Sequence, residues 1–375
     1  MKKIIVVLWC LFFLFGLSSF SARNSVVVNE DIPEIDSLAV VRIVVAGDAM
    51  CHSPQITHAK IPNGTGYDFS GCFQYLTDIL KANDLNIINL ETTLAGEPFT
   101  GYPQFSAPDE YALALKNAGF NFFLLANNHC ADKGTSGTVS TLNKIQNMQI
   151  PSAGTYLNEE DRENRYPAMV EMNGIKIALL NYTYSTNGIT VNKPVFINDL
   201  NDTLQILNDL QIAKNHQPDI IMAFLHWGNE YQQTPSQKQK EQAQFFFNNG
   251  TDVIVGSHPH VVQPVEYFSY NQTDTTQKKL IYWSLGNFIS NQRNENTDGG
   301  ILASFSIIKN TLTNEVRVEN PTAIPYWVYK NTNLHPGYYV LPTKILLNDS
   351  LPFKFLNEDR AAYQRFIENT GKIVK

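Results

Sequence analysis

Residues 40–48 of the chain read VVRIVVAGD, an apolar and largely β-branched run that ends in a glycine and an aspartate. A short run of this kind predicts a buried β-strand, because β-branched side chains pack well on a pleated surface. Comparable runs recur along the chain between polar or glycine-containing segments. The predicted strands are residues 40–46, 85–89, 121–125, 175–181, 219–225, 252–255 and 280–285.

Longer stretches between these runs have the apolar spacing of helices. Two of them are followed by a glycine, Gly119 and Gly250, which is a common stop for a helix. Strands that alternate with helices indicate crossover connections and a helix-covered sheet, so we predict an α/β fold. The predicted helices are residues 74–81, 110–118, 137–148, 200–215 and 236–249, with a final helix near residues 358–368.

Polar residues follow the predicted strands directly, at the point where each strand ends. In open α/β sheets ligands bind at the carboxyl ends of strands, so these residues are expected to converge. Each segment alone is a weak signal, because an aspartate after a strand is also a common helix cap or turn residue. The segments are Gly47-Asp48, Asn89-Leu90-Glu91, Asn127-Asn128-His129, His226-Trp227-Gly228, Gly256-Ser257-His258-Pro259-His260 and Ser284-Leu285-Gly286-Asn287-Phe288.

The carboxylate, amide and imidazole groups of these segments form a transition-metal donor set. Zinc, manganese and iron accept this mixture, whereas calcium prefers oxygen ligands alone. The most specific local signal is the pair His258 and His260, because extended backbone with one intervening residue can aim two imidazoles at adjacent positions. Gly256 before them allows a tight turn. The alternative interpretation is a pair of surface histidines in a loop.

Two further histidines follow predicted strands. His129, next to Asn128, is our candidate acid, because it would lie where a leaving group needs a proton or a developing charge needs a partner. His226 has two interpretations that the sequence leaves open. It could join the metal site, or it could belong to an aromatic packing cluster with Trp227 and Tyr231.

The ordered strand-end motifs resemble those of the CapA family, which is named for poly-γ-glutamate capsule biosynthesis and is similar to the calcineurin-like metallophosphoesterases. The resemblance covers roughly residues 40–307 and includes Asp132, Gly134, Glu230-Tyr231 and Gln263. It implies a metallophosphatase-like four-layer α-β-β-α sandwich with a small C-terminal extension. In the phosphoesterase relatives a metal-activated water attacks phosphorus, because a bound divalent ion lowers the pKa of water to near neutrality.

The resemblance also implies roles for individual residues. It places the catalytic histidine at His129, and we expect the substrate to contact Lys133, Arg293 and Asn287. The cofactor is expected to be one or two divalent transition-metal ions, manganese, zinc or iron. The implied metal ligands are Asp48, Glu91, Asn128, His226, His258 and His260.

One position departs from the phosphoesterase pattern. Those relatives carry a histidine two residues after the first aspartate, and this chain has Met50 there. A thioether is a poor ligand for a hard divalent ion, so one metal position is expected to lack a ligand. A single ion could bind, or His52 or water could substitute, or the site could have drifted from the parent reaction.

The N-terminus carries the pattern of an export segment. Lys2 and Lys3 precede an apolar run, residues 4–17, and then a stretch of small and polar residues. We interpret residues 1–22 as a signal peptide or a membrane anchor and residues 23–37 as a linker. A main domain is predicted over residues 38–310, followed by a C-terminal extension, residues 311–375, that packs on or beside it. The protein is therefore expected outside the cytoplasm, periplasmic or anchored on the outer face of the cytoplasmic membrane.

Three cysteines, Cys51, Cys72 and Cys130, lie beyond the export segment. We interpret them as small buried apolar residues. An alternative is that Cys51 and Cys130 pair across the site. Their spacing does not resemble a zinc module.

The net charge of −7 and the lack of a basic run exclude nucleic acid as a partner. The expected partners are an anionic envelope polymer or a phosphoester substrate, together with membrane-bound polymer synthesis machinery. Two functions fit this pattern. One is a metal-dependent hydrolase that supports the biosynthesis of poly-γ-glutamate or a related polymer, and the other is a non-catalytic component that binds the polymer during synthesis or export.

Overall fold

The structure is a computed structural model that describes residues 37–269, 278–343 and 355–374. The predicted export segment, residues 1–22, lies outside these ranges, as does the predicted linker apart from its last residue. Ser37–Lys375 form one compact unit. Among the helices that the structure describes, none is both long enough and apolar enough to cross a bilayer.

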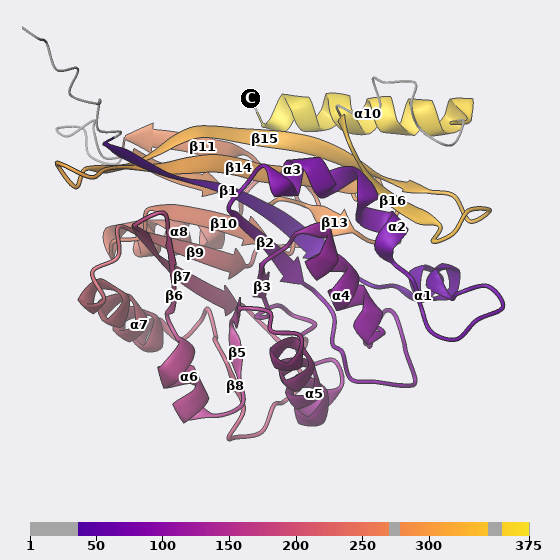
Figure 1. Cartoon of the computed structure of the whole chain (residues 1–375), viewed down its shortest axis with the longest axis horizontal. Coiled ribbons are helices and arrows are strands. Elements are labelled where there is room, and N and C mark those ends of the chain that lie inside the picture. The colour runs from indigo at the N-terminus through magenta and orange to yellow at the C-terminus, as the bar shows by residue number, and fades with distance from the viewer. Residues whose placement is uncertain (1–36, 270–277, 344–354, 375) are drawn as a thin grey trace, which may run out of the picture. The chain divides into compact units, whose positions relative to one another are not determined.

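The first sheet has a parallel half and an antiparallel half that meet at its central strand, β1 (Figure 1). β1 pairs in parallel with β2 on one side and antiparallel with β14 on the other. A short strand, β13 (Asn287–Ile289), also pairs with β1. Across the sheet the order is β16 (Tyr338–Pro342), β15 (Val316–Lys330), β14 (Gly299–Asn310), β1 (Leu38–Ala49), β2 (Leu85–Leu90), β3 (Phe122–Leu124) and β4 (Ser152–Ala153).

The second sheet is parallel in its middle and carries an antiparallel strand at each edge. Its order is β11 (Val265–Ser269), β12 (Lys278–Tyr282), β10 (Val253–Ser257), β9 (Ile220–His226), β7 (Ile175–Thr183) and β6 (Ala168–Met172). A separate small pair joins β5 (Thr155–Tyr156) and β8 (Phe196–Ile197).

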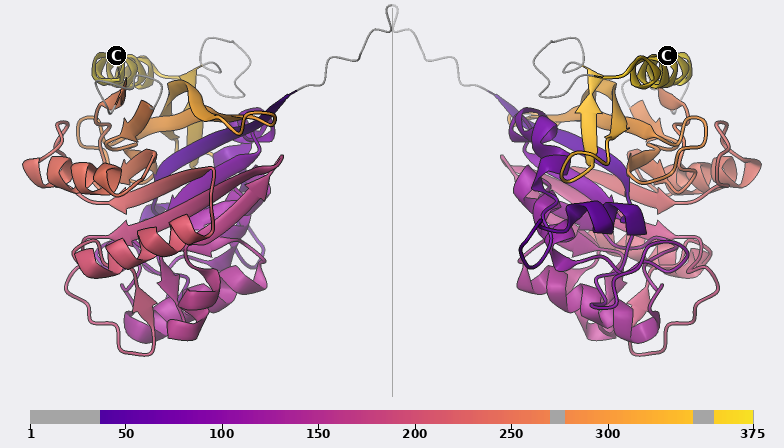
Figure 2. Two further views of the ribbon diagram at one scale, coloured as in Figure 1. Left: turned by 90° about the vertical axis from the view of Figure 1, so that its left-hand side faces the viewer. Right: turned by 90° about the vertical axis from the view of Figure 1, so that its right-hand side faces the viewer.

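Helices cover the outer faces of the two sheets, so the unit has four layers (Figure 2). The first sheet packs against α1 (Ser53–Ala59), α2 (Ser70–Phe73), η1 (Gln74–Leu76), α3 (Thr77–Lys81), α4 (Asp109–Ala118) and α5 (Gly134–Asn147). The second packs against α7 (Thr203–Asn215) and α8 (Gln237–Asn248), and α6 (Glu159–Arg165) lies before β6. The predicted four-layer α/β sandwich is confirmed.

The β-branched run that begins at Val40 explains how the layers stack. Ile43 and Val45 belong to the core that includes the second sheet, whereas Val44 and Ala46 belong to the core under the helices. Alternate residues of a strand point to opposite faces, so β1 needs apolar side chains on both. Full burial of one such aliphatic side chain stabilises the fold by roughly 1.5–3 kcal/mol.

Two differences from the predicted elements change how the chain is arranged. The predicted helix 74–81 is interrupted, because a 3-10 turn, Gln74–Leu76, precedes α3. The predicted strand 280–285 ends at Tyr282, and the chain then crosses to the first sheet and forms β13. Gly286, with φ 73°, lies at this crossing, in a backbone conformation that favours glycine.

The C-terminal residues join the first sheet. β15 and β16 extend it on the β14 side. α10 (Asn357–Ile373) then packs on this extension, where Phe366 is buried against Trp327 and Tyr329. Residues beyond 310 therefore contribute strands to the same sheet that positions β1.

Candidate metal centre

Strands from both sheets direct their carboxyl ends to one place, where polar residues gather. Asp48 is the penultimate residue of β1, and Glu91 directly follows β2. His226 is the last residue of β9, and His258 and His260 follow β10. Because β9 and β10 are parallel neighbours, their ends lie at the same edge of the second sheet.

Asp48 is wholly buried and is oriented by three neighbours. Asn89 donates to Oδ1 at 2.8 Å, and the backbone N–H of His258 donates to Oδ2 at 3.2 Å. Nδ1 of His260 lies 3.2 Å from the same oxygen. Burial alone would raise the pKa of Asp48, but His260, with help from His226 and Asn89, holds it well below its usual range. The carboxylate is therefore ionised and fixed in direction.

Glu91 is also wholly buried, and neither carboxylate oxygen has a hydrogen-bond partner among the described residues. Its Oε1 lies 4.0 Å from Nε2 of His129 and 3.9 Å from Nε2 of both His226 and His260. Burial and then the charge of Asp48 raise the pKa of Glu91 well above its usual value. With metal–ligand bonds of about 2.0–2.2 Å, ligands of one cation lie roughly 3.0–4.4 Å apart, which includes these separations.

His226 connects the two sheets through its ring nitrogens. Its Nε2 lies 2.9 Å from Oδ1 of Asn128, which follows β3, and its Nδ1 lies 2.9 Å from Oγ of Ser257. Burial and then the charge of His258 lower the pKa of His226 well below its usual value. The imidazole is therefore neutral at neutral pH, which is the form that binds metals.

His226 does not pack in an aromatic cluster with Trp227 and Tyr231, which was the alternative interpretation of this residue. Trp227 stacks on Trp283, with ring centroids 5.7 Å apart, in the core beneath the second sheet. Tyr231 is 48% exposed. The ring that stacks on His226 is Tyr184, at 6.5 Å.

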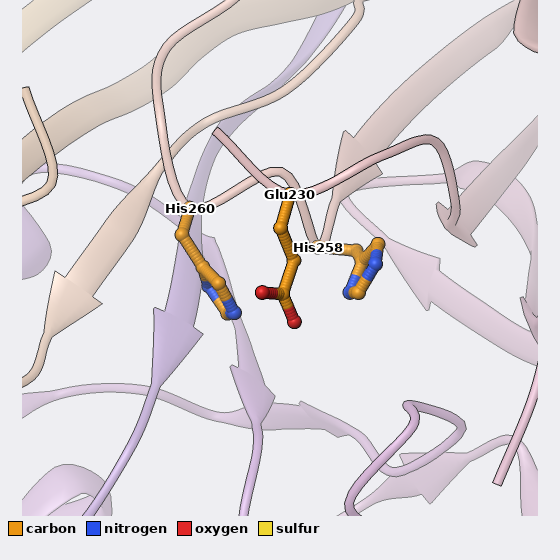
Figure 3. A group of neighbouring side chains, drawn as sticks. All are labelled: Glu230, His258 and His260. Atoms are coloured by element: carbon orange, nitrogen blue, oxygen red, sulfur yellow. The ribbon is translucent and has the colours of Figure 1, made fainter. Parts of the chain in front are cut away.

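His258, His260 and Glu230 form a second group beside Asp48 (Figure 3). Their ligand atoms all lie within 4.8 Å of one another. Nδ1 of His258 is buried and has no hydrogen-bond partner in the described part of the chain. Burial and then the charge of His260 lower the pKa of His258 to about 3, so this ring is neutral too. Glu230 is exposed, unlike both histidines.

His129 lies at the side of this cluster and is oriented by Asp132. Nδ1 of His129 is 2.8 Å from Oδ2 of Asp132, which also accepts from the backbone N–H of Phe105 at 2.6 Å. Because a carboxylate oxygen accepts hydrogen bonds and does not donate them, Nδ1 of His129 is assigned as the donor, and Nε2 is directed toward Glu91. The ring of Phe105 meets that of His129 edge-on at 4.7 Å.

The donor set fits a divalent transition metal. Two carboxylates, an amide and three imidazoles surround a buried point where Glu91 and Nδ1 of His258 have no hydrogen-bond partner in the residues described. Buried polar groups without partners cost free energy, which a bound cation would offset. Asp48, Glu91 and His226 form one group of possible ligands, and Glu230, His258 and His260 form the other.

Comparison with known proteins identifies the family. Residues 42–292 match the family described as "Bacterial capsule synthesis protein PGA_cap". The chain belongs to this family. Among curated relatives, the PGA biosynthesis protein CapA of Bacillus subtilis is 32% identical over 67% of this chain and 64% of its own length. The capsule biosynthesis protein CapA of Bacillus anthracis is 29% identical over 68% of this chain and 61% of its own length.

The predicted resemblance to CapA is thus confirmed. This PGA_cap chain spans somewhat less than two thirds of the length of the curated relatives that it matches.

The solved structures that the chain resembles are more distant in sequence. The calcineurin-like phosphoesterase YfkN of Bacillus subtilis is 12% identical, with a TM-score of 0.45, over 89% of this chain and 98% of its own. A 5'-nucleotidase precursor from Thermus thermophilus is 11% identical, with a TM-score of 0.46, over 89% of this chain and 59% of its own.

The three residues expected to contact substrate lie in different environments in this PGA_cap chain. Lys133 is partly exposed and immediately precedes α5. Arg293 is exposed, and its guanidinium lies 5.7 Å from the ring of Tyr338. Asn287 is wholly buried and donates to Gln292 at 2.9 Å and to the backbone of Thr297 at 2.8 Å. The structure therefore places Asn287 where it supports a loop.

Met50 and His52, which follow Asp48, both take part in hydrogen bonds near the start of α1. The backbone oxygen of Met50 accepts from Gln55 and Tyr111. Nδ1 of His52 lies 3.2 Å from Gln55 Oε1 and accepts from the backbone N–H of a neighbouring loop residue. His52 is therefore engaged in local structure at the start of α1.

Glu230 is the site residue that sequence reasoning did not assign. It lies in the loop after β9, four residues beyond His226, and so does not directly follow a strand. The available signal was its place in the motif His226-Trp227-Gly228 with Glu230-Tyr231, which we used only to support the family resemblance.

Proposed function

We propose that this chain is a metal-dependent hydrolase that acts outside the cytoplasm on an anionic envelope polymer or a phosphoester, in the synthesis of capsule or poly-γ-glutamate. The observation that carries the proposal is the position of Glu91. It is a buried carboxylate with imidazole nitrogens of His129, His226 and His260 within 4.0 Å. Burying a carboxylate without a partner costs folding free energy, and a bound cation would offset that cost.

When bound, a divalent ion would supply an activated water and polarise the group under attack. Asp48, Glu91, Asn128 and His226 are the residues that would hold it, with His260 beside them. His129 has a different task. With its Nδ1 proton held by Asp132, its Nε2 faces the site and can accept a proton from or pass one to the reacting groups.

Tyr184 connects the candidate metal ligands with a neighbouring cavity, which supports a substrate position on this side. Its ring lies 4.6 Å from that of His258, and the same residue lines a cavity of about 470 Å³ beside β8. Lys193, with Thr186 and Thr190, lines that cavity too. A cationic side chain and hydroxyl groups in a cavity that shares Tyr184 with the surroundings of His258 support an anionic substrate.

The names of the curated relatives support the choice of polymer, since both refer to capsule or PGA biosynthesis. Export is supported by Lys2, Lys3 and the apolar run of residues 4–17. The membrane-bound polymer synthesis machinery is the proposed partner.

A non-catalytic role is the second candidate, and Met50 is the observation that favours it, because a thioether is a poor ligand where the phosphoesterase pattern has a histidine. In that case the cluster would hold a cation that binds the anionic polymer without cleaving it.

One set of measurements separates the two candidates. Purified protein is loaded with Mn²⁺ or Zn²⁺, its metal content is measured, and release of product from poly-γ-glutamate and from a model phosphodiester is followed. The hydrolase predicts that His258→Ala loses metal, whereas His129→Ala keeps metal and loses turnover. Absence of stoichiometric metal contradicts both, and metal-loaded wild type that binds polymer but releases no product from either substrate supports the non-catalytic role.

A further inference from the structure

Two cationic side chains lie at the carboxyl-end edge of the first sheet, beyond the metal centre. β13 pairs in parallel with β1, so the loop that follows β13 begins at the edge where Asp48 lies. This loop carries Arg293. β15 runs in the same direction as β1, because both are antiparallel to the strand between them, β14. The last residue of β15, Lys330, therefore lies at the same edge.

Asn291 and Tyr338 hold the two cations in place. Nζ of Lys330 donates to Oδ1 of Asn291 at 2.9 Å, and the hydroxyl of Tyr338 donates to the same oxygen at 2.6 Å. The Lys330 ammonium and the Arg293 guanidinium each lie 5.7 Å from the centre of the Tyr338 ring. One tyrosine ring thus positions both cations.

Neither cation has a counter-charge in the parts of the chain that the structure describes, because no carboxylate there forms an ion pair with Lys330 or Arg293. Arg293 donates to the backbone oxygen of Gln292 at 2.7 Å. The carboxylate of Asp298, in the same loop, accepts from the indole N–H of Trp327. Burial and then the charge of Arg293 lower the pKa of Lys330. Two like charges held together in this way favour an anionic ligand.

His52 connects the cationic pair with the metal centre. The backbone N–H of Asn291 donates to its Nδ1 at 3.3 Å. The ring of His52 meets that of Phe105 edge-on at 5.0 Å, and Phe105 meets His129 edge-on at 4.7 Å. Burial lowers the pKa of His52 to about 4, and the charges of two site histidines and of Arg293 act in the same direction. The pair and the metal centre are therefore within electrostatic reach of one imidazole.

The pair lies on the opposite side of the metal centre from the cavity that Tyr184 and Lys193 line. β15 packs over β12, and β4 packs over β7, which Tyr184 directly follows. β1 and β10, whose ends carry candidate ligands, pack on each other between these two places. Cationic side chains thus flank the centre on both sides, an arrangement that suits an extended polyanion better than one small phosphoester.

We propose that Lys330 and Arg293 bind a carboxylate of the anionic polymer, so that a polymer chain at the metal centre continues over the loop between β13 and β14. The inference rests on the proposed function, because it identifies the substrate of that site as an extended polycarboxylate. Every residue of poly-γ-glutamate carries a free carboxylate, so a chain bound at the centre presents further carboxylates along its length. A guanidinium can bind a carboxylate with two parallel N–H donors, and an ammonium adds a point charge.

The residue that the inference adds is Lys330. It lies in the predicted C-terminal extension, residues 311–375, to which the sequence assigned no part in the site. Because β15 and β16 extend the first sheet, this segment reaches the edge where the substrate would lie.

The test is the binding of fluorescein-labelled poly-γ-glutamate to the full-length protein, measured by fluorescence anisotropy with Mn²⁺ and again with chelator. Lys330→Gln is expected to weaken binding at least about fivefold in both conditions, because the amide can keep the hydrogen bond to Asn291 but carries no charge. Arg293→Gln is expected to weaken binding by a similar factor. Lys330→Arg, which keeps the charge, is expected to restore it. Polymer whose carboxylates are esterified should bind wild type and Lys330→Gln equally.

The matched control is Lys278→Gln, which is expected to leave the affinity unchanged. Lys278 also lies over a tyrosine ring, 4.8 Å from that of Tyr267, but at the amino end of β12, which is the opposite edge of the fold. An equal loss in this control would overturn the inference, because net charge alone would then explain the effect. Wild-type affinity in Lys330→Gln would overturn it too.

Inorganic polyphosphate distinguishes the kind of anion, since a dependence on Lys330 seen with polyphosphate and absent with poly-γ-glutamate would contradict the inference. The measurement with chelator separates the inference from the proposed function. A protein that holds no metal and releases no product would remove the proposed hydrolysis, whereas weaker polymer binding by Lys330→Gln in chelator would still support the carboxylate site.

Discussion

Nδ1 of His129 lies 2.8 Å from Oδ2 of Asp132, and the same carboxylate oxygen accepts the backbone N–H of Phe105. The pair fixes both the tautomer and the direction of the imidazole, so that Nε2 faces Glu91. Among the described residues, the side chain of Asp132 forms no hydrogen bond or ion pair with any candidate metal ligand. It is a positioning residue, and its effect should be separable from metal binding.

Asp132→Asn is therefore expected to lower kcat without loss of metal. An amide can offer its N–H to the ring and so favour the wrong tautomer, which would remove proton transfer worth roughly 10²–10⁴-fold in rate. Steady-state kinetics on a model phosphodiester, with metal content measured in parallel, checks this. An unchanged kcat would show that His129 does not transfer a proton in the rate-limiting step, and lost metal would show that Asp132 acts through the ion.

Glu91→Gln is expected to stabilise the metal-free protein and to abolish its stabilisation by metal. In the wild type, burial and the charge of Asp48 raise the pKa of Glu91, so the folded metal-free state binds a proton that the unfolded state releases. The stability that this group contributes is present below the unfolded pKa, about 4.5, and is lost as pH rises toward the folded pKa. Metal reverses the effect, because it binds the ionised form.

Thermal unfolding against pH, with chelator and with excess Mn²⁺, measures both parts. The metal-free Tm of the wild type should fall as pH rises above about 4.5, and that of Glu91→Gln should fall less. Saturating metal at about 100 times Kd should add roughly 2.7 kcal/mol to the wild type and nothing to Glu91→Gln. Glu160→Gln, an exposed site on α6, is the control. An equal rise in Tm on adding metal in the wild type and in Glu91→Gln would contradict a ligand role for Glu91.

Asp209→Ala is expected to destabilise the fold strongly, because Asp209 is the buried centre of a polar network. Arg162 donates to its Oδ2 at 2.6 Å, Tyr182 donates to the same oxygen at 2.8 Å and Gln205 donates to Oδ1 at 2.9 Å. Removing one member of a buried ion pair leaves the other charge unpaired, at a cost of roughly 3–5 kcal/mol.

The matched comparison is Asp161→Ala, which removes the partner of Arg165 on the same helix as Arg162. That pair is partly exposed, so the expected loss is about 0–1 kcal/mol. Denaturant unfolding of the two variants gives the difference. Similar losses would show that the buried network does not hold α6 and α7 to β7.

The sequence predicted the strands, and the gathering of most candidate ligands at the ends of strands, for a local reason. In β1, alternate apolar residues such as Val44 and Val45 face two different cores, which requires a continuous β-branched run. Such a run can be recognised without knowledge of its partners. A polar residue at the end of such a run, such as Asp48 one residue after Gly47, can then be placed at the edge of the sheet.

Other features depend on contacts that no local pattern encodes. Glu230 reaches the site because the Tyr231 N–H bonds to the carbonyl of Pro259, a contact between residues far apart in the sequence. Asn287 follows a predicted strand, yet it is buried because β13 leaves the second sheet and pairs with β1 opposite Asp48. The prediction for residues 280–285 could not show where the chain would change sheets.

The cysteines give a last test of the fold in solution. Cys51, Cys72 and Cys130 are buried and free, so the pairing of Cys51 with Cys130 that we considered is wrong for this structure. Burial raises the pKa of the Cys130 thiol to about 12 and the pKa of each of the other two thiols well above its usual range. The thiolate is the nucleophile, so all three should be unreactive at neutral pH despite the oxidising surroundings proposed for the protein.

Iodoacetamide at pH ~8, followed by peptide mass mapping, should leave the peptides that contain Cys51, Cys72 and Cys130 unmodified in native protein. Unfolding in guanidinium chloride before alkylation should modify all three, because unfolding restores both access and the ordinary thiol pKa. Native labelling of Cys130, the most accessible of them at 7% exposure, would indicate that the loop between His129 and α5 opens in solution. A mapped disulfide between Cys51 and Cys130 would contradict the free, buried state of both thiols in this structure.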